Sequence, residues 1–223
     1  MTSYDVDIIG FQEFRLAWKP YIDKYFGEHY EMFNKFRNQT TESELESAPI
    51  LWCRDRFTCL KTGWFWLSDT PEVESRGWDE RFNCYRICEY VILRDKANDE
   101  CVTFMNTHFG FGDAGQVKSA ALINKYSEII SDHPTLVVGD FNMQPGSAGY
   151  CEMVQRFIDV DEVTVKDRGC TYHGYDPEHP GAEHIDYCFV NNKVIPIHYE
   201  IIVRVHKEIR EEEKTVRATQ KAT

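Results

Sequence analysis

Short runs of apolar residues that end in polar side chains recur along this chain. Three of them are VDIIGF (residues 6–11), CVTFMNTHF (101–109) and TLVVGDFN (135–142). Branched and aromatic residues dominate these runs, which is typical of strands buried in a sheet. Layered folds build their sites at strand ends, so the polar residues that close each run are candidates for chemistry.

The rest of the pattern predicts further strands, a few helices and polar loops. The additional strands are expected at residues 50–54, 57–68, 85–95, 184–190 and 197–205. Helices are expected at residues 17–26, 112–132 and 150–157, and loops at residues 38–48, 68–83 and 144–149. Strands with occasional helices, several of them in hairpin-like order, indicate an α/β or α+β layered domain.

Length and charge narrow the functional classes. The chain has 223 residues, 42% of them hydrophobic, and a formal net charge of -12. This length and apolar content suffice for one compact domain, or at most two small ones. A protein that binds duplex nucleic acid through its backbone needs a basic face, so the acidic balance favours a smaller substrate over non-specific DNA binding.

The eight cysteines form no CxxC pair, which argues against a zinc knuckle. Several lie within apolar runs, where cysteine usually acts as a small buried hydrophobe. No basic and then apolar leader is visible, so a reducing cytoplasm is the expected location. No stretch approaches the roughly 20 apolar residues that span a bilayer, so no stable membrane insertion is expected.

Glu13 is a carboxylate at the end of a buried strand. Such a group is costly unless it is hydrated or paired, and a hard cation such as Mg²⁺ prefers oxygen ligands. Glu13 is equally consistent with a helix-start residue or a surface ion pair. His108, which closes FMNTHF, is by itself more often a satisfied structural residue than a catalyst.

Asp140 and Asn142 lie two residues apart in LVVGDFN, so on an extended segment their side chains point the same way. Together they offer a carboxylate and an amide that can hold a water and a phosphate oxygen. A strand followed by an Asx turn explains the same residues without chemistry. Asp186, inside the apolar run HIDYCFV, needs a partner, and a catalytic histidine is one candidate. His173 and His184 are equally consistent with polar residues that have no role.

In chain order, IIGFQE, NTHFG, VVGDFN and HIDYCFV resemble the motifs of the endonuclease/exonuclease/phosphatase superfamily, over about residues 5–203. The resemblance implies an α/β (α+β) four-layer sandwich, in which two packed, mainly antiparallel β-sheets are flanked by helices. It implies a divalent-metal-dependent hydrolase of phosphate esters that uses Mg²⁺, or alternatively Mn²⁺, on a small or medium phosphorylated substrate. Two alternatives stay open: a nuclease that acts on DNA or RNA, and a non-catalytic homologue that binds phosphates. Protein partners are not indicated.

The resemblance also implies which residues lie near the metal. Glu13 would bind the divalent cation, and Gln12 would support its position. Asp140 would lie at the same ion, and Asp186 would lie next to it or orient other groups of the site. A metal at this point would neutralise the anionic ester and polarise a phosphoryl oxygen.

The remaining implied roles concern the transferred phosphoryl group. His108 would stabilise the charge that develops on it. Asp140 would activate or orient the attacking water, and Asn142 would hold that water or a phosphate oxygen.

The chain departs from the family pattern at both ends. Family members begin with a strand that carries an Asn near the metal and end with a strand that bears Ser-Asp-His. Neither motif has a counterpart here, and His206 follows Val205 rather than an aspartate. Residues 1–206 are therefore expected to form an incomplete domain, and residues 207–223 a charged tail that is helical or disordered. A fragment of an active enzyme is the favoured explanation; a degenerate homologue and a site completed by another chain are the alternatives.

Overall fold

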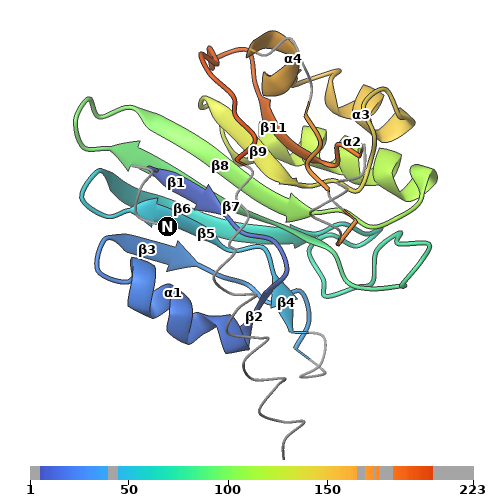
Figure 1. Ribbon diagram of the computed structural model, residues 1–223, viewed down its shortest axis with the longest axis horizontal. Helices are drawn as coiled ribbons and strands as arrows, with labels where there is room; N and C mark the ends of the chain where they lie inside the picture. The colour runs from blue at the N-terminus through green and yellow to red at the C-terminus, as the bar shows by residue number, and fades with distance from the viewer. Residues whose placement is uncertain (1–5, 40–44, 165–168, 173, 176–182, 203–223) are drawn as a thin grey trace, which may run out of the picture.

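The computed structural model describes residues 6–39, 45–164, 169–172, 174–175 and 183–202, and it arranges them as two main sheets with helices beside them (Figure 1). The small sheet is antiparallel in the order β1–β5–β3, with β1 at Ile8–Gly10, β5 at Ile50–Cys53 and β3 at Tyr30–Phe33. The large sheet has the order β10–β11–β9–β8–β7–β6, which are Ile158–Asp159, Asp186–Val190, Thr135–Asp140, Cys101–His108, Ile87–Asp95 and Phe57–Trp66. A third pairing joins β2 (Phe14–Arg15) to β4 (Glu46–Ser47).

Four α-helices accompany these sheets in the described part of the chain. They are α1 (Lys19–Phe26), which follows the 3₁₀ turn η1 (Leu16–Trp18), α2 (Asp113–Ile130), α3 (Ala148–Met153) and α4 (Val160–Thr164). Pro20 suits the first turn of α1, because the first N–H groups of a helix have no intrahelical acceptor. Among the helices of the described ranges, none is long and apolar enough to cross a bilayer.

Two apolar clusters hold the layers together. One lies between the two sheets and includes Trp52 of β5 and Leu93 of β7, and the other lies between the large sheet and α2 and includes Ile123 of that helix. β8 contributes to both, because successive side chains of a strand point to opposite faces: Phe104 belongs to the first cluster and Met105 to the second. Figure 1 shows the same order, with the small sheet on one side of the large sheet and α2 and α3 on the other.

Strand pairing brings the ends of β8 and β9 and the start of β11 together. β8 and β9 are parallel and joined by α2, and His108 is the register partner of Asp140. β9 and β11 are antiparallel, and Asp140 is the register partner of Asp186. Gly139 permits the close approach of β9 to β8, because a Cβ at this position would lie 2.1 Å from the carbonyl oxygen of Thr107. Three of the residues selected from the sequence therefore meet at one edge of the sheet.

The side chain of Asn106 ties the segment that follows β1 to the large sheet. Its Nδ2 donates to the carbonyl oxygens of Phe11 (2.8 Å), Ala48 (2.9 Å) and Pro49 (3.1 Å). Its Oδ1 accepts a hydrogen bond of 2.7 Å from Nε2 of Gln12. Asn106 is fully buried, so water cannot replace these bonds if the carboxamide is lost.

The observed elements confirm the mixed α/β class and differ from the expected ones at a few places. Residues 197–202 carry no strand, and the rest of that predicted strand lies outside the described residues, as do residues 207–223. The short helix expected at residue 150 begins at Ala148, because the hydroxyl of Ser147 caps it by accepting from the N–H of Tyr150. The loop predicted at 38–48 contains β4, and the pattern missed the short elements β3, β10 and α4. The four-layer arrangement remains a prediction.

We expect Asn106→Ala to lower the free energy of unfolding by about 2–4 kcal/mol, because it leaves several buried polar groups without partners. Asn192→Ala, at an exposed position, should change it by less than about 0.5 kcal/mol. Urea denaturation of the two variants and the wild type measures both differences. Equal stabilities for all three proteins would contradict the role given to Asn106.

Candidate active site

A cavity of about 840 Å³, here called the site cavity, opens at these strand ends. Glu13, His108, Asp140 and Asn142 all line it, so four of the five residues selected from the sequence share one cavity. Asp186 is not among the lining residues, but it lies beside Asp140 as its register partner across β9 and β11.

His108 and Asp140 lie close together in the site cavity. Their Nε2 and Oδ2 atoms are 3.6 Å apart, which makes an electrostatic contact rather than a hydrogen bond. Burial lowers the pKa of His108 well below its usual range, and the charges of Arg86 and Arg37 lower it further. The imidazole is therefore neutral at pH 7 and carries one N–H that it can donate.

Carboxylates crowd around Asp140. Burial raises the pKa of Asp140 to about 7, and the negative charges of Asp186 and Glu13 act in the same direction. Burial also raises the pKa of Asp186. Ionising several carboxyl groups here is unfavourable in the protein alone, and a bound cation would relieve that repulsion.

Asn142 reaches the site cavity through a turn. β9 ends at Asp140, Asn142 has a left-handed φ of 49°, and its N–H donates to Oδ1 of Asp140 at 2.9 Å. The extended geometry expected for residues 140–142 is therefore wrong, and the Asx turn that was the alternative is present. The Nδ2 of Asn142 also donates to the carbonyl oxygen of Phe109 at 3.0 Å, which fixes the amide beside the carboxylate.

Glu13 also has a left-handed backbone, with a φ of 53°. Its side chain is exposed to the site cavity, and the preceding Gln12 is held by Asn106. Left-handed φ values are uncommon for residues other than glycine and cluster at functional sites. Glu13 and Asn142, two of the five selected residues, both have them.

The carboxylate oxygens of this cavity are ligands of the kind that a hard cation prefers, but they do not form a preformed coordination shell. Across the described ranges, no group of three or more His, Cys, Asp or Glu side chains is placed to hold a metal ion. Mg²⁺ does not need such a group, because it usually keeps several waters and binds one or two carboxylates. Glu13 and Asp140 provide oxygen ligands of this kind, and Asp186 adds negative charge next to Asp140.

Arginine side chains line the same cavity. Glu46 accepts from both Arg15 and Arg37, and Asp79 accepts from Nε and Nη2 of Arg86 at 3.3 and 3.2 Å. Three guanidinium groups therefore share two carboxylates. Burial lowers the pKa of Arg37, and the charge of Arg86 lowers it further, as expected for two cations held close together.

Sequence reasoning missed these arginines. Arg86 directly precedes β7, whose start pairs with the end of β8. A hairpin drawn through residues 85–109 would therefore have placed Arg86 near His108. Arg37 directly precedes the loop predicted at residues 38–48 and Glu46 lies within it, and no periodic pattern pointed to either residue.

Aromatic residues form the rim of the site cavity. The Arg81 guanidinium lies 5.0 Å from the ring centroid of Phe82 and 5.1 Å from that of Phe111. Tyr172 and Tyr175 form a second pair with centroids 5.9 Å apart. Because Phe82 is 58% and Tyr175 84% exposed, these rings can contact a substrate that enters the cavity.

Of the two other histidines considered from the sequence, His184 does not join the site. His184 is buried, with Nδ1 2.8 Å from the carbonyl oxygen of Gly169 and Nε2 3.9 Å from Oδ2 of Asp161. It is not among the residues that line the site cavity. His173 lies outside the described residues.

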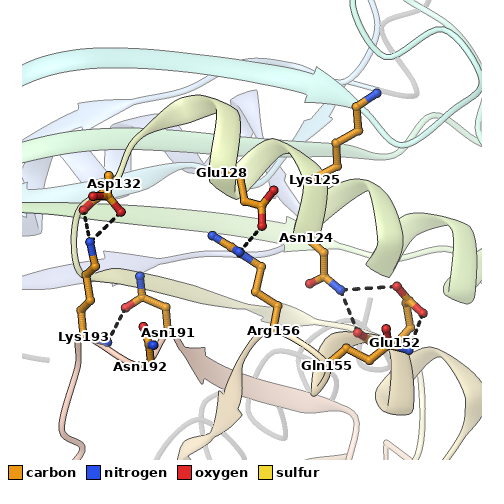
Figure 2. A pocket seen from close by; sticks show the side chains of 10 residues that line it. All are labelled: Asn124, Lys125, Glu128, Asp132, Glu152, Gln155, Arg156, Asn191, Asn192 and Lys193. Carbon is orange, nitrogen blue, oxygen red and sulfur yellow. Dashed lines mark hydrogen bonds and ion pairs between the residues drawn. The ribbon is translucent and has the colours of Figure 1, made fainter.

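Another cavity, of about 670 Å³, lies by α2, α3 and the chain after β11 (Figure 2). Its charged side chains largely pair with one another: Lys193 contacts Asp132 at 2.6 Å, and Arg156 pairs with Glu128. None of the five selected residues lines it. The site cavity is therefore the better candidate for chemistry.

The sequence pattern of the Endonuclease/Exonuclease/phosphatase family matches residues 1–206. The chain belongs to the endonuclease/exonuclease/phosphatase family. The family expectation drawn from the four motifs is confirmed, and it identifies the general chemistry as that of a phosphoesterase. Members of the family are typically dependent on divalent metals.

Solved structures of the endonuclease/exonuclease/phosphatase family share this fold. A family member from Bacteroides thetaiotaomicron has a TM-score of 0.77 and 27% identity, over 84% of this chain and 70% of its own. A mannosyl-6-phosphatase from Bacteroides thetaiotaomicron VPI-5482 has a TM-score of 0.76 and 27% identity, over 84% and 72% respectively. The human Nocturnin catalytic domain with bound sulfate has a TM-score of 0.67 at 12% identity, over 85% and 71%, and supports the fold alone. No curated protein matches the sequence.

The raised pKa of Asp140 predicts a specific pH dependence of stability. A carboxyl group with a pKa of about 7 when folded and about 3.9 when unfolded binds more protons in the folded state. Its contribution therefore lowers the free energy of unfolding as the pH rises from about 4 to about 7, and the loss persists above that range.

In metal-free protein at pH 8, Asp140→Asn should therefore raise the free energy of unfolding by about 1–3 kcal/mol. This is less than the full shift would give, because the Asp140 side chain is 21% exposed. Asp99→Asn, whose side chain is 84% exposed, serves as the control. Urea denaturation in a chelator at pH 5 and pH 8 measures the effect, and a loss of stability at pH 8 would refute the assignment.

Proposed function

We propose that this chain is a divalent-metal-dependent hydrolase that acts on small or medium phosphate esters. One observation supports this most directly: the carboxylates Glu13 and Asp140, the neutral His108 and the guanidinium groups of Arg37 and Arg86 line the same cavity. A phosphate ester carries negative charge into such a site, where a cation and fixed donors can stabilise it. The family's phosphoesterase chemistry supports the same reaction class.

In the proposed mechanism, Glu13 and Asp140 would hold Mg²⁺, or alternatively Mn²⁺, and Asp186 would add negative charge beside them. The ion supplies charge neutralisation and polarises a phosphoryl oxygen. Asp140 orients the attacking water and accepts its proton, and the amide of Asn142 holds that water or a phosphoryl oxygen.

The neutral imidazole of His108 donates a hydrogen bond to a phosphoryl oxygen as charge develops on it. The water oxygen forms the new bond to phosphorus, and the bond from phosphorus to the ester oxygen breaks. The departing oxygen takes up a proton from solvent and leaves as an alcohol. Gln12 keeps Glu13 in place through its bond to Asn106.

The relatives indicate which substrates to test first. One structurally similar protein is named as a mannosyl-6-phosphatase, which supports phosphorylated sugars as a starting set. The net charge of -12 favours such small molecules over long polyanions.

Nucleic acid is the second candidate substrate class, and the rim of the site cavity favours it. Exposed rings such as Phe82 and Tyr175 can stack on bases, and Arg81 can contact a backbone phosphate. Single-stranded oligonucleotides therefore belong in the same assay series as sugar phosphates.

A cytoplasmic location is part of the proposal. All eight cysteines are free thiols, which suits a reducing compartment. Burial raises the pKa of Cys188 to about 12, so this thiol stays protonated and unreactive.

We expect the purified protein to hydrolyse a phosphate ester in Mg²⁺ or Mn²⁺ and to lose this activity in a chelator. Asp140→Ala should lower kcat by about 10²–10⁴-fold, because it removes the proposed general base and a metal ligand. Glu100→Ala, in the turn between β7 and β8, should leave kcat unchanged.

Release of the alcohol product, measured with each protein and with and without chelator, distinguishes a hydrolase from a non-catalytic homologue. Activity that survives the chelator or Asp140→Ala would contradict the proposal. Stabilisation by Mg²⁺ without any turnover would instead favour a non-catalytic homologue that binds phosphates.

A further inference from the structure

Arg86 is a buried cation with an unused donor. It is only 5% exposed, and its Nε and Nη2 both donate to Oδ2 of Asp79. Its Nη1 is also buried, yet it has no hydrogen-bond partner among the described residues. An unpaired N–H on a buried guanidinium is unfavourable, so a bound acceptor at this position would be stabilised.

Arg37 adds a second guanidinium to the same place. Its side chain is 14% exposed, and it pairs with Glu46, which also binds Arg15. Glu46 and Asp79 are the ionic partners of these arginines, and the charge of Glu13 also acts on Arg37. The feature that an anion can satisfy is therefore the unpaired Nη1 of Arg86. The site cavity, which all three arginines line, is where an anion can reach them.

A small recess beside Arg37 and Arg86 fits an oxygen atom but no larger group. A recess of about 10 Å³ is lined by Glu13, Arg37, Glu46, Arg86 and His108, all of which also line the site cavity. That volume is close to the roughly 10–15 Å³ that one water molecule needs. An organic substituent does not fit there, so it must lie towards the wider part of the site cavity.

We infer that Arg37 and Arg86 form a subsite for the non-bridging oxygens of a phosphate monoester, and that the protein selects monoester dianions over diesters. This inference rests on the proposed phosphoesterase function and specifies its substrate class. A monoester carries up to two negative charges, three terminal oxygens and one organic group, which matches the two guanidinium groups, the oxygen-sized recess and the wider site cavity beside it. A diester carries one negative charge and a second organic group, so it loses part of the attraction to the arginines.

Two substrates with the same leaving group test the selectivity. We expect the full chain in Mg²⁺ to hydrolyse 4-nitrophenyl phosphate with a kcat/KM at least about tenfold above that for methyl 4-nitrophenyl phosphate. Arg86→Lys keeps a positive charge beside Asp79 but loses the Nη1 donor. It should lower kcat/KM for the monoester about tenfold or more and that for the diester by less than about threefold. Arg94→Lys, exposed in β7 and paired with Asp99, is the matched control.

A binding measurement separates this inference from the function on which it rests. Isothermal calorimetry with inorganic phosphate should give an affinity that Arg86→Lys weakens about tenfold, while the affinity for Mg²⁺ stays unchanged. Failure of wild type to hydrolyse either ester would overturn the function, and Arg86-dependent phosphate binding would still support the subsite. The inference would be overturned if wild type hydrolysed the two esters at equal rates, or if Arg86→Lys lowered both rates equally. It would also be overturned if the folded Arg86→Lys and Arg37→Lys variants bound phosphate as wild type does.

Discussion

The carboxamide of Asn106 is the interaction on which the geometry of the candidate site depends. Glu13 follows a strand of the small sheet, whereas His108 and Asp140 end strands of the large sheet. Asn106 connects the two, because it lies in β8 two residues before His108 and holds Gln12, the neighbour of Glu13. A change at this buried position would displace Glu13 from the other site residues without altering any group that faces the cavity.

A second buried side chain supports the same connection. Glu89 is the register partner of Asn106 on β7, and its carboxyl oxygens accept from the backbone N–H groups of Lys35 and Ala48, both at 3.0 Å. Burial raises its pKa well above the usual range. The interface between the sheets therefore combines an apolar cluster with the buried polar side chains of Asn106 and Glu89. Their hydrogen bonds fix the orientation of the two sheets more specifically than apolar packing alone would.

The site itself is unfavourable for stability. Asp140 has its pKa raised to about 7 by burial and neighbouring carboxylates, and Arg86 retains a buried donor without a partner in the described part of the chain. A neutral residue at position 140 would relieve the repulsion between the carboxylates, whereas loss of Arg86 would leave the buried Asp79 without its ionic partner. A cation and an anionic ester, bound together, would satisfy both kinds of group.

The sequence predicted the parts of this site that depend on strand pairing. His108 and Asp140 close apolar runs that flank a helical segment, and a strand–helix–strand unit places the ends of its two parallel strands side by side. Asn142 was placed correctly near Asp140 for the wrong reason, since a turn rather than an extended strand brings it there. Arg37 could not be predicted, because its position depends on the ion pair with Glu46 and on no periodicity.

A crystal structure of the protein with Mg²⁺ and inorganic phosphate would show whether both ions bind in the site cavity. We expect Mg²⁺ to be bound by Glu13 and Asp140, and a phosphate oxygen to lie within hydrogen-bonding distance of Nη1 of Arg86, in the same cavity as His108 and Asn142. Phosphate bound only in the cavity beside Lys193 and Arg156, with the site cavity holding neither ion nor anion, would contradict it.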